Sequence, residues 1–173
     1  MELSVRILGI DPGSRLTGYG IVDLHGHSIR YVASGCIRTP DGSHIDRLHS
    51  IGCGIRELLD TYEPMEAAVE QVFVSKNASS ALKLGQARAA AICRILDDLQ
   101  SDRIYEYTPR AIKQATVGFG GATKDQVQHM MKQLLKLSGV LSSDAADALA
   151  VAVCHANSRG LNSRLRAAAE SAQ

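Results

Sequence analysis

The 173-residue sequence lacks the features that mark several common classes of protein. No segment approaches the ~20 consecutive apolar residues of a membrane-spanning helix, and no basic stretch followed by a long apolar one opens the chain, as in a secretory signal. The four cysteines form no CxxC pair, which disfavours a zinc site and a disulfide framework. The net charge is only +1, so charge alone does not indicate nucleic-acid binding. We therefore expect a cytoplasmic protein with reduced thiols and no membrane association.

What the chain does contain is an alternation of strand and helix patterns. Apolar and β-branched runs predict strands at residues 5–10, 17–23, 28–38, 66–74 and 103–107. Helical spacing of apolar residues predicts helices at residues 44–62, 77–99, 109–117, 123–137 and 143–157. The order indicates an α/β fold with a five-stranded mixed sheet and helices on both faces. We expect a single domain over residues 1–157, followed by a flexible, polar C-terminal tail at 158–173.

Two of the apolar strands each contain one acidic residue. Asp11 ends the first, in ILGIDPG, and Glu70 lies in the fourth, in AAVEQV. Because a buried, unpaired carboxylate costs several kcal/mol or changes its pKa, each acid needs a partner. Taken singly, Asp11 could be a turn residue before Pro-Gly, and Glu70 could belong to a buried ion pair. If the two strands are adjacent and parallel, both carboxylates can share a face.

A second pair of acids opens the last predicted helix, in LSSDAADALAVAV. Asp144 and Asp147 are three residues apart, so they project from one side of its first turn. The alternative is that both simply favour a helix N-terminus. Together with the two strand-borne acids, they could form a site of four carboxylates. Oxygen ligands, with no His or Cys in these segments, predict Mg²⁺ or Mn²⁺ rather than zinc.

Three segments of the sequence resemble the RuvC family of Holliday junction resolvases. They are LGIDPGSRLTGYG, EQVFVSKNASSALKLGQARAAA and DAADALAVAVCHA, and the resemblance extends from about residue 5 to 157. It implies a ribonuclease H-like fold and a nuclease that resolves four-way DNA junctions by paired symmetric nicks, in homologous recombination and DNA repair. Two divalent ions in one site can activate water and stabilise the leaving oxygen of a phosphodiester. The residues that match the family's four catalytic and metal-binding acids are Asp11, Glu70, Asp144 and Asp147.

The resemblance also implies contacts with DNA around these acids. Phe73 matches a residue that stacks at the opened centre of the junction, where an apolar wedge can unstack bases; a core aromatic is the alternative. Lys76 and Asn77 follow in the same loop. Lys113 and Lys124 align with family lysines near the scissile phosphate, although most lysines simply lie in solvent.

Two protein partners are implied by the same resemblance. One is a second copy of the chain, because two symmetric cuts require two sites and a twofold dimer supplies them. The candidate interface is the stripe of small and apolar residues from Ala78 to Ile95. The other partner is a RuvA–RuvB branch-migration complex.

Two further classes of function remain open from the sequence. An actin-like ATPase or sugar kinase shares the sheet topology and an Asp-x-Gly phosphate turn, but it needs two such lobes, and 173 residues hold one. A catalytically inactive nucleic-acid-binding module is the other class. The presence of all four acids argues against it.

Overall fold

The computed structural model describes residues 4–72 and 77–170. The strands are β1 (Val5–Asp11), β2 (Leu16–His25), β3 (Ser28–Arg38), β4 (Glu66–Glu70) and β5 (Ile104–Tyr107). The helices are α1 (His44–Tyr62), α2 (Ala78–Ile95), the 3₁₀ turn η1 (Ser101–Arg103), α3 (Pro109–Val117), α4 (Lys124–Leu134) and α5 (Ser143–Glu170). The strands form one sheet in the order β3-β2-β1-β4-β5. The predicted five-stranded mixed sheet is confirmed, since β1 pairs antiparallel with β2 and parallel with β4.

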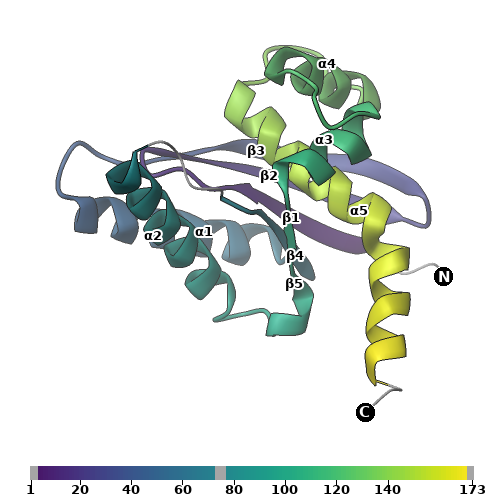
Figure 1. Cartoon of the computed structure of the whole chain (residues 1–173), viewed down its shortest axis with the longest axis horizontal. Coiled ribbons are helices and arrows are strands. Elements are labelled where there is room, and N and C mark those ends of the chain that lie inside the picture. The colour runs from purple at the N-terminus through teal and green to yellow at the C-terminus, as the bar shows by residue number, and fades with distance from the viewer. Residues whose placement is uncertain (1–3, 73–76, 171–173) are drawn as a thin grey trace.

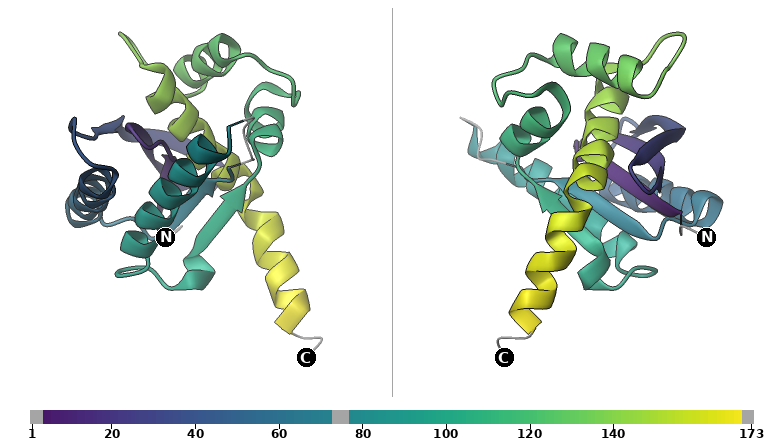
Figure 2. Two further views of the ribbon diagram at one scale, coloured as in Figure 1. Left: turned by 60° about the vertical axis from the view of Figure 1, so that its left-hand side comes forward. Right: turned by 90° about the vertical axis from the view of Figure 1, so that its right-hand side faces the viewer.

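The sheet lies between two helical layers (Figure 1). Alternation along β1 divides its side chains between them, because successive residues of a strand point to opposite faces. Leu8 and Ile10 pack with α1 and α2, whereas Ile7 packs with α3, α4 and α5. Figure 2 shows that α3 and α4 lie beside the N-terminal half of α5, while its C-terminal half extends past the sheet. Asp11 has the same parity as Ile7 and therefore lies on the α5 face.

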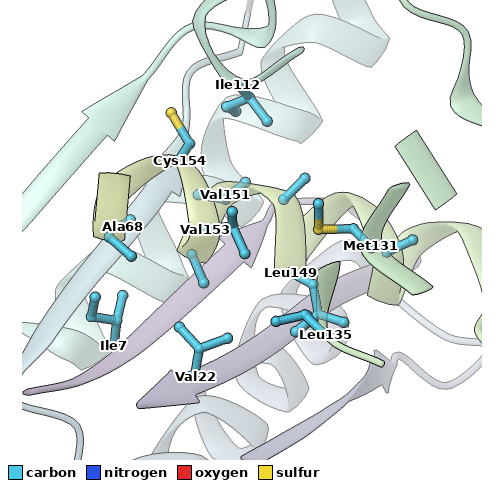
Figure 3. Close-up of a cluster of buried hydrophobic side chains, with 14 of the residues drawn as sticks. Ile7, Val22, Ala68, Ile112, Met131, Leu135, Leu149, Val151, Val153 and Cys154 are labelled. Carbon is cyan, nitrogen blue, oxygen red and sulfur yellow. The ribbon is translucent and has the colours of Figure 1, made fainter. Parts of the chain in front are cut away.

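The core on the α5 face is built mainly from aliphatic side chains of the sheet and the last helix (Figure 3). Ile7, Val22 and Leu149 are fully buried, and burying such a side chain contributes roughly 1.5–3 kcal/mol. Met131 from α4 and Ile112 from α3 extend this core to the helices beside α5. Apolar packing thus fixes α3, α4 and α5 as one layer, in which α5 lies mainly over β1 and β2.

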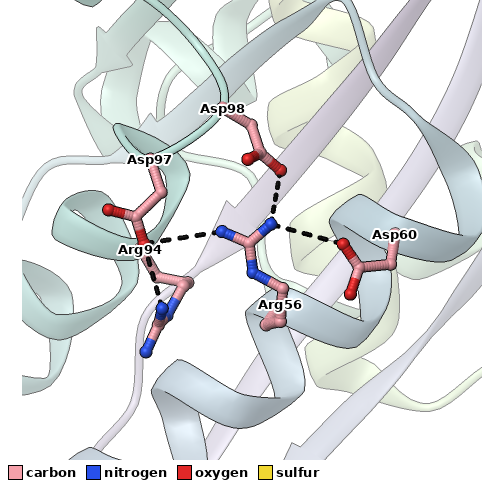
Figure 4. Close-up of polar contacts among 5 residues, drawn as sticks. All are labelled: Arg56, Asp60, Arg94, Asp97 and Asp98. Atoms are coloured by element: carbon pink, nitrogen blue, oxygen red, sulfur yellow. Dashed lines mark hydrogen bonds and ion pairs between the residues drawn. The ribbon is translucent and has the colours of Figure 1, made fainter.

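A surface network joins α1 to the end of α2 on the opposite face (Figure 4). Arg56 lies 2.7 Å from Asp98, 3.3 Å from Asp60 and 3.5 Å from Asp97. Arg94 also contacts Asp97, at 3.0 Å. Exposed ion pairs contribute about 0–1 kcal/mol each, so this network adds little to the stability of the fold.

Several predicted boundaries are wrong. The helices expected to end at residues 99 and 137 end at Ile95 and Leu134, and two further differences lie closer to the acids. The fourth strand was expected to reach residue 74, but β4 ends at Glu70. Its neighbour β5 ends at Tyr107, whose carbonyl accepts a hydrogen bond from the Gln71 N–H at 2.8 Å, and the described part of the β4–β5 ladder ends there. The last helix was expected to end at residue 157, but α5 continues to Glu170, and Arg159 bonds to Glu66 of β4. No described helix is both long and apolar enough to cross a membrane.

Candidate active site

The parallel pairing of β1 and β4 brings the two strand-borne acids together. Ile10 is opposite Val69 in the ladder, so the next residues, Asp11 and Glu70, lie side by side at the carboxyl ends of their strands. A side-chain hydrogen bond joins the two carboxyl groups. The condition stated from the sequence, that the strands be adjacent and parallel, is therefore met.

Glycines in the sheet allow α5 to reach the ends of these strands. An added Cβ at Gly18 of β2 would lie 2.2 Å from the carbonyl oxygen of Asp144, and one at Gly9 of β1 would lie 2.3 Å from that of Ala148. The backbone of α5 therefore rests directly on the backbone of the sheet. This contact sets the first turns of α5, with their two acids, beside Asp11, which pairs with Gly18 across the β1–β2 ladder.

Three of the four predicted acids line one cavity of about 260 Å³. They are Asp11, Glu70 and Asp147, contributed by β1, β4 and α5. Asp144 does not line this cavity, although its charge acts on Lys124. The structure thus brings three of the acids together, and places the fourth one helical turn away on the same helix.

Two predicted lysines line the same cavity. Lys113 comes from α3, and Lys124 is the first residue of α4, where Thr123 and Gln126 form a capping box. The Lys124 Nζ lies 3.1 Å from Asp147 Oδ2. Pro109 and other apolar residues complete the wall. The cavity therefore combines carboxylates that can bind a cation with ammonium groups that can face a phosphate.

The pKa values in the cavity follow from burial and from the crowding of acids. Burial, the hydrogen bond to Glu70 and the charges of Glu70 and Asp147 raise the pKa of Asp11 to about 9. Burial also raises the pKa of Glu70, while its hydrogen bond with Asp11 opposes that change. The two carboxyl groups therefore share a proton, which forms the hydrogen bond between them. The hydrogen bond and charge of Asp147 raise the pKa of Lys124. Clustered titratable groups with perturbed pKa values are typical of functional sites.

The donor set suits a hard divalent cation. Carboxylate oxygens are the ligands that Mg²⁺ and Mn²⁺ prefer, and a cation would relieve the repulsion that raises the pKa of Asp11. Among residues 4–72 and 77–170, no three His, Cys, Asp or Glu side chains already form a metal-holding group. The reason lies in their present partners: Asp11 bonds to Glu70 and Asp147 pairs with Lys124. These side chains must exchange those partners to act as ligands.

The remaining predicted site residues follow β4 in the sequence. Phe73 and Lys76 fall outside the described residues. Asn77 is the N-cap of α2, and its Oδ1 accepts hydrogen bonds from the N–H groups of Ser79 and Ser80 at 3.0 and 3.2 Å. The structure therefore gives Asn77 a helix-capping role, as its position before an alanine-rich run predicts.

Sequence reasoning missed one contact at this site. Arg88 of α2 donates its Nε–H to the backbone carbonyl of Glu70 at 3.2 Å and also pairs with Glu106 of β5. It therefore holds the end of β4, rather than facing solvent. Arg88 and Glu70 are 18 residues apart and belong to different elements, so no sequence pattern predicts their contact. The contact depends on the packing of α2 against the sheet.

Comparison with known proteins finds similar sequences that match most of this chain. The sequence model for "Crossover junction endodeoxyribonuclease RuvC" matches residues 7–155. The protein of that name from Dichelobacter nodosus is 57% identical over 152 residues, covering 88% of this chain and 85% of that relative. The one from Aromatoleum aromaticum is 53% identical over 156 residues, covering 90% and 83%.

Solved structures agree with the sequence comparison. A structure of T. thermophilus RuvC in complex with a Holliday junction substrate matches with a TM-score of 0.81 at 30% identity, covering 91% of this chain and 96% of that one. The yeast mitochondrial Holliday junction resolvase Ydc2 matches with a TM-score of 0.64 over 98% of this chain and 85% of its own. At 10% identity, this second likeness shows the shared fold alone.

Proposed function

The chain belongs to the RuvC family of crossover junction endodeoxyribonucleases, and from this premise we propose that it resolves four-way DNA junctions by paired symmetric nicks. The proposed roles are homologous recombination and DNA repair. The ribonuclease H-like fold expected from the sequence agrees with the match to T. thermophilus RuvC. An ATPase lobe, the alternative from another class, has no comparable support.

One observation carries this proposal: three carboxylates and two lysines from five separate elements line a single cavity. Hydrolysis of a phosphodiester requires neutralised phosphate oxygens and a positioned water. Acids alone would repel the DNA backbone, and lysines alone would bind DNA without cutting it. Their combination in 260 Å³ suits a phosphate held against a bound cation.

Catalysis in this family depends on divalent metal ions, and we propose Mg²⁺ as the ion here, two per site, with Mn²⁺ able to replace it. Asp11, Glu70 and Asp147 are the proposed ligands, and Asp144 joins them from the preceding turn of α5. When bound, the ions would supply an activated water and offset the charge of the phosphate. Lys124 would release Asp147 to the metal and turn its ammonium group to the DNA.

DNA contacts are proposed for five further positions. Lys113 and Lys124 flank the acids in the cavity and would bind the phosphates next to the cut. Phe73 is proposed to stack at the opened junction centre, with Lys76 and Asn77 supporting the same loop. The capping role of Asn77 is compatible with this, because it fixes the start of α2 directly after these residues in the chain.

We further propose a twofold homodimer that uses the exposed side of α2. The predicted stripe divides in two: Ala87, Ala91 and Ile95 are buried against the protein's own sheet, whereas Leu82 is 65% exposed. A second copy packed on the exposed half would supply the second active site. Action beside a RuvA–RuvB complex, in the cytoplasm, and a single nuclease domain belong to the same proposal. The flexible tail expected at residues 158–173 is not part of it, because α5 continues to Glu170 and Arg159 bonds to Glu66.

Asp11→Asn tests the assignment of the acids. The variant should lose cleavage of a synthetic four-way junction in Mg²⁺, because the proposed metal ligand is gone, while still binding the junction. Binding is measured by fluorescence anisotropy in Ca²⁺, whose looser coordination should support binding with little cutting. Asp23→Asn is the matched control. Asp23 pairs with Arg6 at the opposite end of the β1–β2 ladder from Asp11. Equal cleavage by the wild type and the Asp11 variant would refute the assignment.

A further inference from the structure

A buried polar network lies under α5, beyond the cavity. His155 is fully buried, and its Nε2 lies 2.8 Å from Oε2 of Glu66, which is 2% exposed. Its Nδ1 lies 2.8 Å from the hydroxyl of Tyr107, and the ring of Tyr105 lies 4.1 Å from the imidazole. Arg159 also donates to both oxygens of Glu66, at 3.0 and 3.2 Å. Each ring nitrogen of His155 therefore has one partner, on two different strands.

The protonation of the network follows from these contacts. Burial would raise the pKa of Glu66, but the hydrogen bonds from His155 and Arg159 lower it to about 2. Glu66 is therefore an anion that accepts from the Nε2–H of His155. The Nδ1 atom and the Tyr107 hydroxyl share the second hydrogen bond. Together the two bonds fix the orientation of the imidazole ring.

The network meets the proposed active site at Tyr107. In the parallel β4–β5 ladder, Tyr107 is the partner of Glu70. The next residue, Thr108, is the N-cap of α3, the helix that carries Lys113. The Tyr107 hydroxyl bonds to α5, the helix that carries Asp147 two turns before His155. Tyr107 thus adjoins the three elements that supply Glu70, Lys113 and Asp147: β4 through its backbone, α3 through the chain, and α5 through its hydroxyl.

The close contacts at Gly9 and Gly18 set the distance between α5 and the sheet. The packing around them is made of small and aliphatic side chains, such as Ala148 and Ala152, and does little to fix the helix along its axis. Such packing is non-directional, whereas hydrogen bonds have strict distance and angle requirements. A slip of one residue would move Asp147 by about 1.5 Å. A misplacement of about 1 Å at a reacting centre can cost ~100-fold in rate.

We propose that Tyr107 and His155 are positioning residues, which set Asp147 on α5 and Lys113 on α3 in register with Glu70. The inference rests on the proposed nuclease function and adds to it residues that do not touch the DNA. Glu66 and Arg159 anchor the far end of the network and stabilise the fold. The Tyr107–His155 bond is the part that the reaction rate depends on.

Tyr107→Phe removes only this hydroxyl. Tyr31→Phe is the matched control, because the Tyr31 hydroxyl bonds to Ser34 at 3.2 Å and its ring packs on the same core without contacting the network. At saturating junction and Mg²⁺, we expect Tyr107→Phe to cleave about tenfold more slowly than the wild type, with an unchanged Kd for the junction in Ca²⁺. Its melting temperature should also rise less than that of the control when Mg²⁺ replaces EDTA, because the ligands are misaligned. Equal rates and equal metal-induced rises for the two variants would overturn the inference.

Two substitutions of His155 separate an effect on positioning from an effect on stability. They test the positioning role even if Tyr107→Phe does not fold. An Asn amide occupies the place of Nδ1 and can reach Tyr107, whereas a Gln amide occupies the place of Nε2 and can reach Glu66. We expect His155→Gln to be the more stable variant and His155→Asn the faster one. If the rates follow the melting temperatures, the network is structural only. If the wild type does not cut junctions at all, the proposed function fails, whatever these variants do.

Discussion

Gly18→Ala tests how closely the active site depends on the contact between α5 and the sheet. The added Cβ would lie 2.2 Å from the Asp144 carbonyl oxygen, where a Cβ contact under 3.0 Å is essentially never found. The two nearest atoms, at 2.2 and 2.9 Å, belong to the backbone of Asp144, and the third is the Cβ of Ala148 at 3.3 Å, so no flexible side chain can move aside. The start of α5 must therefore retreat by about 1 Å, which carries Asp144 and Asp147 away from Asp11.

The magnitude follows from this displacement. Overpacking a tight contact costs typically about 1–3 kcal/mol of unfolding free energy, and a shift of about 1 Å can cost ~100-fold in cleavage rate. Urea unfolding and single-turnover junction cleavage measure the two effects. Gly160→Ala in α5 is the control, because an added Cβ there meets nothing within 4 Å; it should cleave like the wild type and be slightly more stable. If Gly18→Ala matches this control in rate and stability, the close contact does not position the acids.

Three further predictions concern the charged groups. Without metal, the free energy of unfolding should fall as the pH rises from about 4 to about 9, which are the pKa values of Asp11 in the unfolded and the folded protein. The reason is that the unfolded chain releases the Asp11 proton at lower pH than the folded protein does. Urea unfolding in EDTA should show a flatter pH profile for Asp11→Asn, and an equal slope for the variant and the wild type would contradict this. Glu66 has the opposite sign, because hydrogen bonds from His155 and Arg159 lower its pKa to about 2. Its contribution to the free energy of unfolding, about 2 kcal/mol after a discount for the partly exposed Arg159, should be lost as the pH falls from about 4 to 2, and Glu66→Gln should remove this loss at acid pH. Asp147→Asn should raise the melting temperature in EDTA at pH 8 and low salt, because it relieves repulsion with Asp11 and Glu70. It loses only the ion pair with Lys124, whose side chain is largely exposed. A lower melting temperature would show that this ion pair outweighs the repulsion.

The strands and the acids at their ends could be predicted because their signals are local. The apolar run before Asp11 identifies β1, and its alternation places that carboxylate on a definite face. The pairing of Asp11 with Glu70 required one further condition, the adjacency of β1 and β4, which the connection through α1 makes natural. The convergence of Asp147 follows once α5 packs on that face.

The supporting contacts could not be predicted, because they join residues that are distant in sequence. Glu66 and His155 are 89 residues apart, and each has an ordinary role when read locally: a strand residue and a helix residue. The close contacts at Gly9 and Gly18 depend on the docking of a helix more than 120 residues later in the chain. Asp144 was expected beside the other three acids, but the axis of α5 leaves it outside their cavity.

Strand-by-strand mapping of cleavage on a synthetic four-way junction tests the central claim most directly. Each strand is labelled in turn and incubated with the wild-type protein in Mg²⁺ and in EDTA, beside a linear duplex of the same sequence. The account predicts two nicks at symmetry-related positions on opposing strands, none in EDTA, and an intact linear duplex. Equal cutting of the duplex, or an uncut junction in Mg²⁺, would contradict it.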